Sequence, residues 1–330
     1  MSAAPLLQIE HLNVGFDTAM GAIMVVRDLD LVLEEGETLC IVGESGSGKS
    51  MTALAIMGLV PEPLRVVGGG SIKLSGEELV GASHRRLRQI RGKRISMVFQ
   101  EPMSSLNPVF SVGEQIAETL RLHEGLGRRD ARAAAIEMLQ AVGIPAPERR
   151  VDDYPHQMSG GMRQRVMIAM ALACRPAILI ADEPTTALDV TVQAQIMDLL
   201  KDVQRRFGTA ILLITHDIGI VAEAADRVIV LYAGRRVEEG SAEEVLRRPA
   251  HPYTAALVAC APQQLLLGGE RRILPEIPGI VPSLLRMPPG CAFAPRCARA
   301  TAECHAKAPP LLELSAGRAS ACWLATELGR

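Results

Sequence analysis

Residues 43–50, Gly-Glu-Ser-Gly-Ser-Gly-Lys-Ser, could bind the phosphates of a nucleotide. They fit the pattern G-x-x-x-x-G-K-[ST] between an apolar run, Thr38–Val42, and a stretch with helical character. Glycines let backbone N–H groups surround phosphate oxygens, and a helix N-terminus adds positive potential, whereas a glycine-rich turn without function would not require the Lys-Ser pair. We expect Lys49 to reach the β- and γ-phosphates and the Ser50 hydroxyl to bind Mg²⁺. The nucleotide-contacting residues expected here are Gly43, Ser45, Gly46, Ser47, Gly48, Lys49, Ser50 and Met51.

Two carboxylates, Asp182 and Glu183, follow the apolar run Ile178–Ala181. In open α/β sheets, ligands bind at the carboxyl ends of the strands. We therefore expect Asp182 to hold Mg²⁺ through water and Glu183 to polarise the water that attacks the γ-phosphate. An acidic pair after a strand is more often a helix N-cap, and the phosphate loop is what favours the catalytic interpretation.

A Ser-Gly-Gly sequence, Ser159-Gly160-Gly161, precedes a long helical stretch that begins at Met162. The serine hydroxyl and the glycine N–H groups could bind an anion at the N-terminus of this helix. An ordinary serine N-cap followed by flexible glycines explains the same residues.

Four of the seven cysteines lie in the last forty residues, with the spacing Cys291-x5-Cys297-x6-Cys304-x17-Cys322. A cytosolic compartment keeps thiols reduced, so metal or redox chemistry is favoured over disulfides. Four thiolates suit zinc or an iron–sulfur cluster. Structural zinc sites use a close C-x₂₋₄-C pair, which is missing among these four, so the longer spacing favours a [4Fe–4S] cluster. Zinc and unliganded thiols are the alternatives.

The elements that must position these residues alternate between strands and helices. Short runs rich in Ile, Leu and Val are typical of buried parallel strands, and the clearest are Thr38–Val42, Ala177–Ala181, Ala210–Thr215 and Val228–Tyr232. Helical patterns lie between them, at Lys49–Leu59, Val112–Leu122, Ala131–Val142, Met162–Ala173 and Val192–Phe207. The alternation predicts an α/β fold in which helices cover a sheet.

The composition changes after Glu244, because eight prolines fall between residues 275 and 310. Such a segment can form little helix or sheet. We expect residues 1–245 to form one domain, whose sheet is complete before the rest begins. Residues 246–330, called the C-terminal lobe below, are expected to be small and irregular and to be held by the metal site. Arg296 and Arg299 could offset the charge of the thiolates.

Length and composition limit the class of protein. A chain of 330 residues is long enough for about two domains. Its 35 Lys and Arg residues against 37 Asp and Glu give a net charge of −2, without the positive surplus that nucleic-acid binders use. The longest apolar runs, such as Val166–Cys174, are about half the length of a membrane span. No Lys or Arg precedes Arg27, so we expect no signal peptide and a cytosolic, globular protein.

Together these motifs resemble the ATP-binding subunits of ABC transporters. The family signature is usually written LSGGQ, and here Met158–Met162 has MSGGM, which departs at its last position. The resemblance implies a P-loop NTPase fold, an ABC-type nucleotide-binding domain with a RecA-like α/β core and a helical subdomain near residues 103–165. It also implies that Ser159, Gly160 and Gly161 face the γ-phosphate held by another subunit.

Further residues match this family in the expected order. Gln100, at the end of the apolar run Ile95–Phe99, resembles the Q-loop glutamine that senses Mg²⁺ and water. Ala187-Leu188-Asp189 resembles the D-loop, and His216 resembles the switch histidine that contacts the γ-phosphate. Phe16 resembles the aromatic residue that stacks on adenine, although a core aromatic residue explains it equally well.

The resemblance narrows to the peptide/nickel importer branch on the segments Gln100–Pro108, His156–Arg165, His251–Thr254 and Ile277–Pro282. It covers essentially the whole chain, and some members of the family carry a [4Fe–4S] cluster. It implies an ATPase that drives peptide import at the cytoplasmic face of the inner membrane. The partners would be two permease subunits, a second ATP-binding subunit in a heterodimer, and a substrate-binding protein. Nickel chelates or other small solutes are the alternative cargo.

A soluble ABC ATPase acting on nucleic acid or ribosomes is the rival class. Such proteins usually fuse two ATPase units or insert long coiled coils between the ATP motifs, and this chain has one set of motifs. Its net charge of −2 also lacks the surplus of positive charge that attracts the phosphates of nucleic acid. An inactive, ATP-sensing regulator is disfavoured because Lys49, Asp182, Glu183 and His216 are all present.

Overall fold

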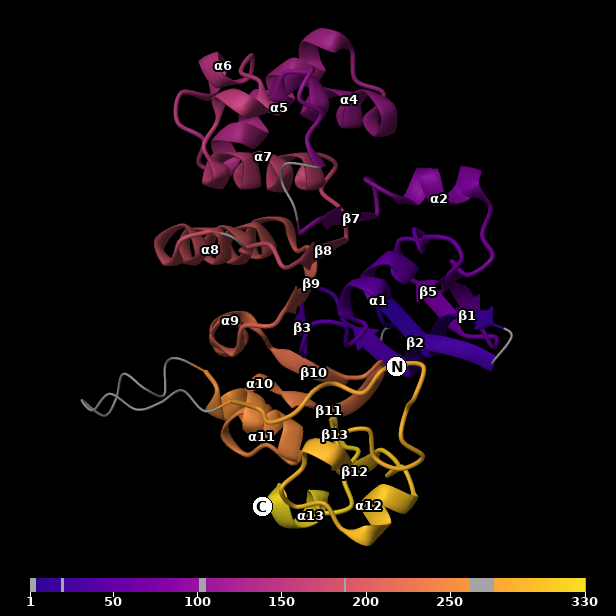
Figure 1. The fold of residues 1–330 in the computed structure, drawn as a ribbon. Helices are drawn as coiled ribbons and strands as arrows, with labels where there is room; N and C mark the ends of the chain where they lie inside the picture. Colours follow the sequence, from indigo (N-terminus) through magenta and orange to yellow (C-terminus); the bar gives the residue numbers. More distant parts are fainter. Residues whose placement is uncertain (1–3, 19–20, 101–104, 187, 262–275, 330) are drawn as a thin grey trace, which may run out of the picture. The chain divides into compact units, whose positions relative to one another are not determined.

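The computed structural model describes residues 4–18, 21–100, 105–186, 188–261 and 276–329. The chain divides into two compact units (Figure 1). Unit 1 comprises residues 1–32, 38–80 and 214–330, and unit 2 comprises residues 33–37 and 81–213.

An antiparallel sheet begins unit 1. Its strands are β1 (Leu7–Thr18), β2 (Gly21–Leu33), β4 (Arg65–Val67), β5 (Ser71–Leu74) and β6 (Glu77–Glu78). They follow the order β2-β1-β5-β6, and β4 also pairs with β1. In β1 the buried side chains of Leu7 and Ile9 alternate with more exposed ones until His11, whose φ is 50°. This left-handed residue shifts the alternation by one position, as a β-bulge does, so that Leu12 and Val14 are buried.

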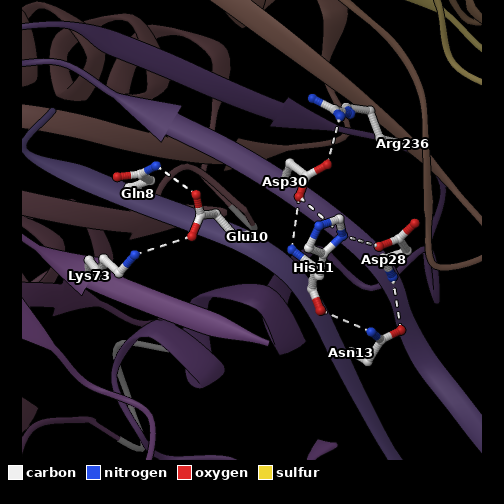
Figure 2. A network of polar contacts seen from close by, with 8 residues as sticks. All are labelled: Gln8, Glu10, His11, Asn13, Asp28, Asp30, Lys73 and Arg236. Carbon is white, nitrogen blue, oxygen red and sulfur yellow. Dashed lines mark hydrogen bonds and ion pairs between the residues drawn. The ribbon is translucent and has the colours of Figure 1, made fainter. Parts of the chain in front are cut away.

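Polar side chains connect β1 and β2 to β11 (Arg235–Ser241), as Figure 2 shows. The N–H of His11 donates to Asp30 Oδ1 at 2.8 Å, and His11 Nδ1 lies 2.8 Å from Asp28 Oδ1. Asp30 Oδ2 also lies 3.3 Å from Arg236 Nη2. The hydrogen bond to Asp28 raises the pKa of the exposed His11. Since exposed pairs contribute little free energy, this network aligns the strands rather than stabilising them.

Unit 1 also contains part of a second sheet, with the strand order β12-β13-β11-β10-β3. Here β3 (Thr38–Val42) is parallel to β10 (Arg227–Tyr232), and β11 is antiparallel to β10. The C-terminal lobe supplies β12 (Leu312–Ser315) and β13 (Arg318–Ser320), and Ser320 pairs with Glu238 of β11. The prediction that the sheet is complete before the lobe is therefore wrong. Residues 311–320 contain no proline, and these strands are too short to show a periodic pattern.

The helices of unit 1 are short: α1 (Lys49–Ile56), α9 (Ile218–Ala224), α10 (Ala242–Arg247), α11 (Pro252–Ala259), η3 (Ala294–Arg296), α12 (Ala302–Ala306) and α13 (Ala325–Leu328). A capping box begins α10, because Ser241 Oγ accepts from the N–H of Glu244 and the Glu244 carboxylate accepts from the N–H of Ser241. The buried Glu238 carboxylate accepts from the N–H groups of Ala250 at 2.7 Å and His251 at 3.0 Å. It thereby ties β11 to the start of α11, and its burial raises the pKa of Glu238.

Unit 2 is built on buried strands in the order β9-β8-β7. β7 (Ile95–Val98) and β8 (Ile178–Asp182) are parallel, and the first four residues of β9 (Ala210–Thr215) fall in this unit. Every residue of these strands is buried, as is typical of strands covered on both faces. Their continuous apolar character follows from that burial.

The helices of unit 2 are α2 (His84–Ile90), α4 (Val112–Glu124), α5 (Arg128–Ala141), α6 (Pro147–Arg150), η1 (Pro155–Gln157), α7 (Gly160–Leu172) and α8 (Val190–Phe207). α4, α5 and α7 pack against one another, and α7 also packs on β7 (Figure 1). The N–H of Glu114 donates to the capping side chain of Ser111 at the start of α4, and Gly125 ends this helix with φ 69°. Within the described ranges, no helix is long and apolar enough to span a bilayer.

Candidate functional site

The phosphate loop, residues 43–50, connects β3 to α1 in unit 1. Gly43 and Gly48 have φ values of 156° and 100°. A Cβ atom on Gly43 would lie 2.2 Å from the carbonyl oxygen of Leu231, and one on Gly48 would lie 2.8 Å from that of Val25. Only glycine fits at these two positions, because neighbouring backbone passes so close to the loop.

Lys49 is only 5% exposed, and its ammonium group lies against the loop. Nζ donates to the carbonyl oxygen of Gly43 at 2.7 Å and to that of Glu44 at 3.0 Å. A buried cation needs such acceptors. These contacts hold a positive charge at the start of α1, where helix N–H groups also favour an anion.

The other residues predicted in this loop differ in exposure. Ser45 and Gly46 are exposed, whereas Ser50 and Met51, in the first turn of α1, are half-buried. Ser47 is buried, and its Oγ has no hydrogen-bond partner among the described residues. A buried hydroxyl normally has a partner, so this one is suited to bind a ligand oxygen.

The predicted acidic pair lies in unit 2, where Asp182 is the last residue of β8 and is 5% exposed. Glu183 has φ 46°, a left-handed conformation that costs about 1 kcal/mol or more for a residue other than glycine. Its Oε2 accepts from Gln100 Nε2 at 2.9 Å and from Thr186 Oγ1 at 2.9 Å. The structure thus brings Glu183 together with the predicted Gln100.

Thr186 is the residue of this cluster that the sequence analysis missed. The N–H of Thr186 donates to the carbonyl oxygen of Glu183 at 3.2 Å, which closes a four-residue turn. A hydroxyl three residues after a candidate catalytic carboxylate was a signal in the sequence. A threonine in a turn is so common, however, that the signal has little weight without the structure.

The remaining candidates of unit 1 are His216 and Phe16. His216 follows β9 directly and is exposed, next to Asp217, whose side chain accepts from the N–H of Gly219 and begins α9. Phe16 is half-buried on β1. Each lies in the same unit as the phosphate loop.

The Ser-Gly-Gly sequence begins α7 in unit 2. Ser159 Oγ accepts from the N–H of Met162 at 3.3 Å, so the N-cap interpretation is confirmed. Ser159 and Gly160 are exposed, and a Cβ atom on Gly161 would lie 2.9 Å from a methyl group of Val192. The small residues therefore bring the start of α7 close to α8.

The D-loop candidate is described only in part, because Ala187 lies outside the described residues. Asp189 caps α8, since its Oδ1 accepts from the N–H of Val192 at 3.0 Å. Residues 101–104, which follow Gln100, also lie outside the described part of the chain.

The four C-terminal cysteines line one small pocket of the C-terminal lobe, together with His251, Phe293, Arg299 and Trp323 among others. Cys304 and Cys322 are buried and Cys291 and Cys297 are half-buried, and no disulfide is formed among the cysteines of the described residues. Burial raises the pKa of Cys291 and Cys297, and it raises that of Cys322 to about 11. Burial therefore makes the thiols of Cys291, Cys297 and Cys322 harder to deprotonate than an exposed thiol. In the part of the chain that the structure describes, no group of three or more His, Cys, Asp or Glu side chains is arranged to hold a metal ion.

The prediction that Arg296 offsets the charge of the thiolates is wrong, because its guanidinium group is paired with Glu44 of the phosphate loop. Nη1 lies 2.6 Å from Glu44 Oε2, and Nη2 lies 3.0 Å from Oε1. Arg299, in contrast, is exposed and lines the cysteine pocket.

Comparisons with known proteins cover most of the chain. Residues 26–186 match the family model described as "ABC transporter", and residues 237–304 match "Oligopeptide/dipeptide transporter, C-terminal region". The chain is 51% identical over 322 residues to the oligopeptide transport ATP-binding protein OppD of Salmonella typhimurium, covering 98% of this chain and 94% of that protein. It is 51% identical over 323 residues to OppD of Haemophilus influenzae, covering 98% of each. It also resembles the dimeric structure of a post-hydrolysis state of the ATP-binding cassette MJ0796 bound to ADP and Pi, with a TM-score of 0.64 and 30% identity, over 72% of this chain and 98% of that one.

Proposed function

The chain belongs to the family of ABC transporter ATP-binding proteins, and from this we propose that it hydrolyses ATP to power the import of peptides. The phosphate loop carries the proposal, because its glycines, its buried Lys49 and the Ser47 hydroxyl, which has no partner among the residues described, suit phosphate oxygens. The relatives that match almost the whole chain are oligopeptide transport proteins, which supports peptides as the cargo over nickel chelates or other small solutes.

We assign phosphate binding to the N–H groups of the loop and to Lys49. Ser50, Gln100 and Asp182 offer oxygen atoms, which Mg²⁺ prefers as ligands. Asp182 is only 5% exposed, and a buried carboxylate favours a nearby cation. Asp182 is therefore suited to bind Mg²⁺, and we propose Ser50 and Gln100 as further ligands. Mg²⁺ when bound would neutralise charge on the β- and γ-phosphates.

We propose that Glu183 polarises and orients the water that attacks the γ-phosphate. The hydrogen bonds from Gln100 and Thr186 fix the orientation of its carboxylate, which a general base or water-orienting group requires. His216 is proposed to contact the γ-phosphate, and Phe16 is proposed to stack on adenine.

Ser159, Gly160, Gly161 and Asp189 are proposed to complete the ATP site of a second ATP-binding subunit. The exposure of Ser159 and Gly160 at the start of α7 supports this assignment, since an anion is stabilised at a helix N-terminus. The altered signature, with Met162 at its last position, favours a different polypeptide as the partner.

The full chain alone is expected to hydrolyse ATP at least about 10-fold more slowly than the assembled transporter, because loss of one transition-state donor costs about 100-fold or more. Phosphate release is measured for both, with light scattering to establish the molar mass of the isolated chain. Full turnover by a demonstrably monomeric preparation would contradict the composite site.

The proposed assembly contains two permease subunits and a substrate-binding protein, with this chain as a peripheral subunit at the cytoplasmic face of the inner membrane. The oligopeptide transport relatives support this assembly. Nucleic acid is not among the proposed partners.

We propose a nucleotide-binding domain over residues 1–245, with a helical subdomain near 103–165, followed by the lobe over 246–330. The packing of α4, α5 and α7 supports the subdomain, and the family match over residues 237–304 supports an accessory lobe.

We further propose that the lobe holds a [4Fe–4S] cluster, with Zn²⁺ as the alternative. Cys291, Cys297, Cys304 and Cys322 line one pocket and are the donor set that such a cluster requires. His251 supports the fit, because its Nδ1 accepts from the N–H of Tyr253, and its buried Nε2 has no partner within the described ranges. Burial lowers the pKa of His251 to about 3, so the ring is neutral and Nε2 carries hydrogen. A cluster would supply sulfur atoms that accept it and would act as a structural staple.

The full chain purified anaerobically is expected to be brown and to contain about four irons, as this cluster type requires. Cys304→Ser is expected to lose the iron and to become more sensitive to protease within the lobe. The matched control is Cys260→Ser, which changes a half-buried cysteine at the end of α11 outside the pocket lining. A colourless protein with about one zinc would support the zinc alternative. A metal-free chain in which all four thiols react with an alkylating agent would contradict both.

A further inference from the structure

Glu44, the second residue of the phosphate loop, is held at three of its groups. Its N–H donates to Tyr253 Oη at 2.8 Å, and its carboxylate accepts two hydrogen bonds from Arg296, at 2.6 and 3.0 Å. Its carbonyl oxygen accepts from Lys49 Nζ at 3.0 Å. Tyr253 and Arg296 belong to the C-terminal lobe, and all four residues lie in unit 1. The lobe is therefore in direct contact with the loop.

The side chain of Arg296 is 4% exposed, and each of its N–H groups has an acceptor. In addition to the two bonds to Glu44, Nε donates to the carbonyl oxygen of Pro278 at 2.8 Å. Nη1 donates to Tyr232 Oη at 3.2 Å, and Nη2 donates to the carbonyl oxygen of Ile277 at 3.2 Å. Exposed ion pairs contribute little, but a buried, bidentate pair with a fixed plane has defined geometry and greater strength.

Aromatic rings hold this arginine in place. The ring centroids of Tyr232 and Tyr253 lie 4.6 Å apart, and that of Phe293 lies 5.3 Å from the first and 5.4 Å from the second. The guanidinium carbon of Arg296 lies 5.8 Å from the ring centroids of both Tyr232 and Phe293. Since Phe293 also lines the cysteine pocket, the position of Arg296 depends on how the lobe packs.

The charge of Glu44 is the physical reason that this contact matters. A carboxylate in a loop that accepts a triphosphate would repel it, unless a cation compensates its charge. The guanidinium group of Arg296, which stays charged in proteins, donates both hydrogen bonds to the Glu44 carboxylate and so supplies this cation. The pair also immobilises the loop before ATP arrives, which lowers the entropic cost of binding.

We propose that Arg296 is a positioning residue for ATP binding, and that the folded C-terminal lobe, through Arg296 and Tyr253, raises the affinity of the phosphate loop for ATP. The inference rests on the proposed ATP-binding role of this loop. On this proposal the C-terminal lobe regulates the nucleotide site and is more than an appended module.

The test is a titration of the full chain with MgATP, in wild type and variants. Arg296→Gln is expected to raise the Kd about 10-fold, as loss of a charged hydrogen-bonded pair would. Glu44→Gln combined with Arg296→Gln is expected to restore the Kd to within about threefold of wild type, because the uncompensated charge is then absent. In the assembled transporter, Arg296→Gln is expected to raise KM for ATP while kcat at saturating ATP stays close to wild type.

The matched control is Arg247→Gln, which removes an exposed pair with Glu243 on α10, 3.3 Å between Nη1 and Oε1. Its Kd is expected to equal that of wild type. A folded Arg296→Gln variant that binds ATP like wild type, or a double variant whose defects add, would overturn the proposal.

If Arg296→Gln does not fold, the Kd for MgATP is measured on Tyr253→Phe instead, because this change removes only the hydroxyl that accepts from the N–H of Glu44. A Kd raised a few-fold supports the proposal, and an unchanged Kd overturns it. Failure of the wild-type chain to bind MgATP would instead refute the proposed function itself.

Discussion

Glu183→Gln is expected to lower ATP hydrolysis by the assembled transporter about 100-fold or more, while the affinity for MgATP stays within about threefold of wild type. The carboxylate is proposed to orient the attacking water and does not hold the phosphates, so its loss affects the transition state and not nucleotide binding. Gln and Glu have the same shape, and the amide oxygen of Gln can still accept from Gln100 or Thr186, so the local fold is retained. Phosphate release and equilibrium titration with MgATP measure the two quantities.

The matched control for this variant is Glu118→Gln, which makes the same chemical change at an exposed position of α4 in the same unit. Its hydrolysis rate and ATP affinity are expected to equal those of wild type. A Glu183→Gln variant that hydrolyses ATP at the wild-type rate would exclude the assigned role. An equal loss of ATP binding would show that the side chain acts on the phosphates instead.

Lys49→Ala is expected to weaken binding of MgATP about 10- to 100-fold, since a charged hydrogen bond contributes roughly 1.5–3 kcal/mol. The change also removes Nζ, which donates to the carbonyl oxygens of Gly43 at 2.7 Å and Glu44 at 3.0 Å, so both carbonyl groups lose this hydrogen bond. Hydrolysis should fall with occupancy, and excess ATP should restore part of it. Equilibrium titration with MgATP, with thermal unfolding as a check on the fold, measures the effect.

Lys73→Ala serves as the control, because it removes a lysine of the same unit whose Nζ lies 3.2 Å from Glu10 on the antiparallel sheet. Its ATP affinity should be unchanged. Wild-type affinity in Lys49→Ala would mean that the backbone N–H groups bind the phosphates without this cation.

The predicted fold class, a P-loop NTPase of the ABC type, is confirmed by the similarity to solved ABC cassettes. Strands β3, β8, β9 and β10 could be predicted within a residue, because each is a continuous apolar run buried on both faces. The long strands β1 and β2 were missed. Each contains a residue with positive φ, His11 at 50° and Asp28 at 49°, and β1 shows how such a residue interrupts the alternation that a strand would otherwise display.

The helices could be predicted in type but less well in their ends. The α8 prediction began at Val192, whereas the helix begins at Val190 because Asp189 is its N-cap. An apolar pattern identifies the face of a helix, and the capping residue determines where the helix starts.

The site could be predicted where a short motif carries the chemistry and not where distant segments meet. Gln100 and Glu183 lie 83 residues apart and are joined by a hydrogen bond. Glu183 had been predicted from its position after an apolar run, and Gln100 from the family order of motifs. The pair of Glu44 with Arg296 spans 252 residues, and Glu44 occupies a position where the loop motif allows any residue. Only the packing of Phe293 and Tyr253 around β10 brings these two charges together.

The pairing of β13 with β11 also bears on the solubility of the chain. A strand at the edge of a sheet exposes unpaired N–H and C=O groups, which can recruit strands of other chains and start aggregation. Here the N–H of Ala321 donates to the carbonyl oxygen of Val237 at 2.8 Å, so the lobe covers the edge that β11 would otherwise expose. The new edge is β12, four residues long, with an exposed carboxylate at Glu313, and short, charged edges resist such pairing. A chain cut at residue 245 would therefore expose a sheet edge that can pair with other chains, even though it would keep every residue of the phosphate loop.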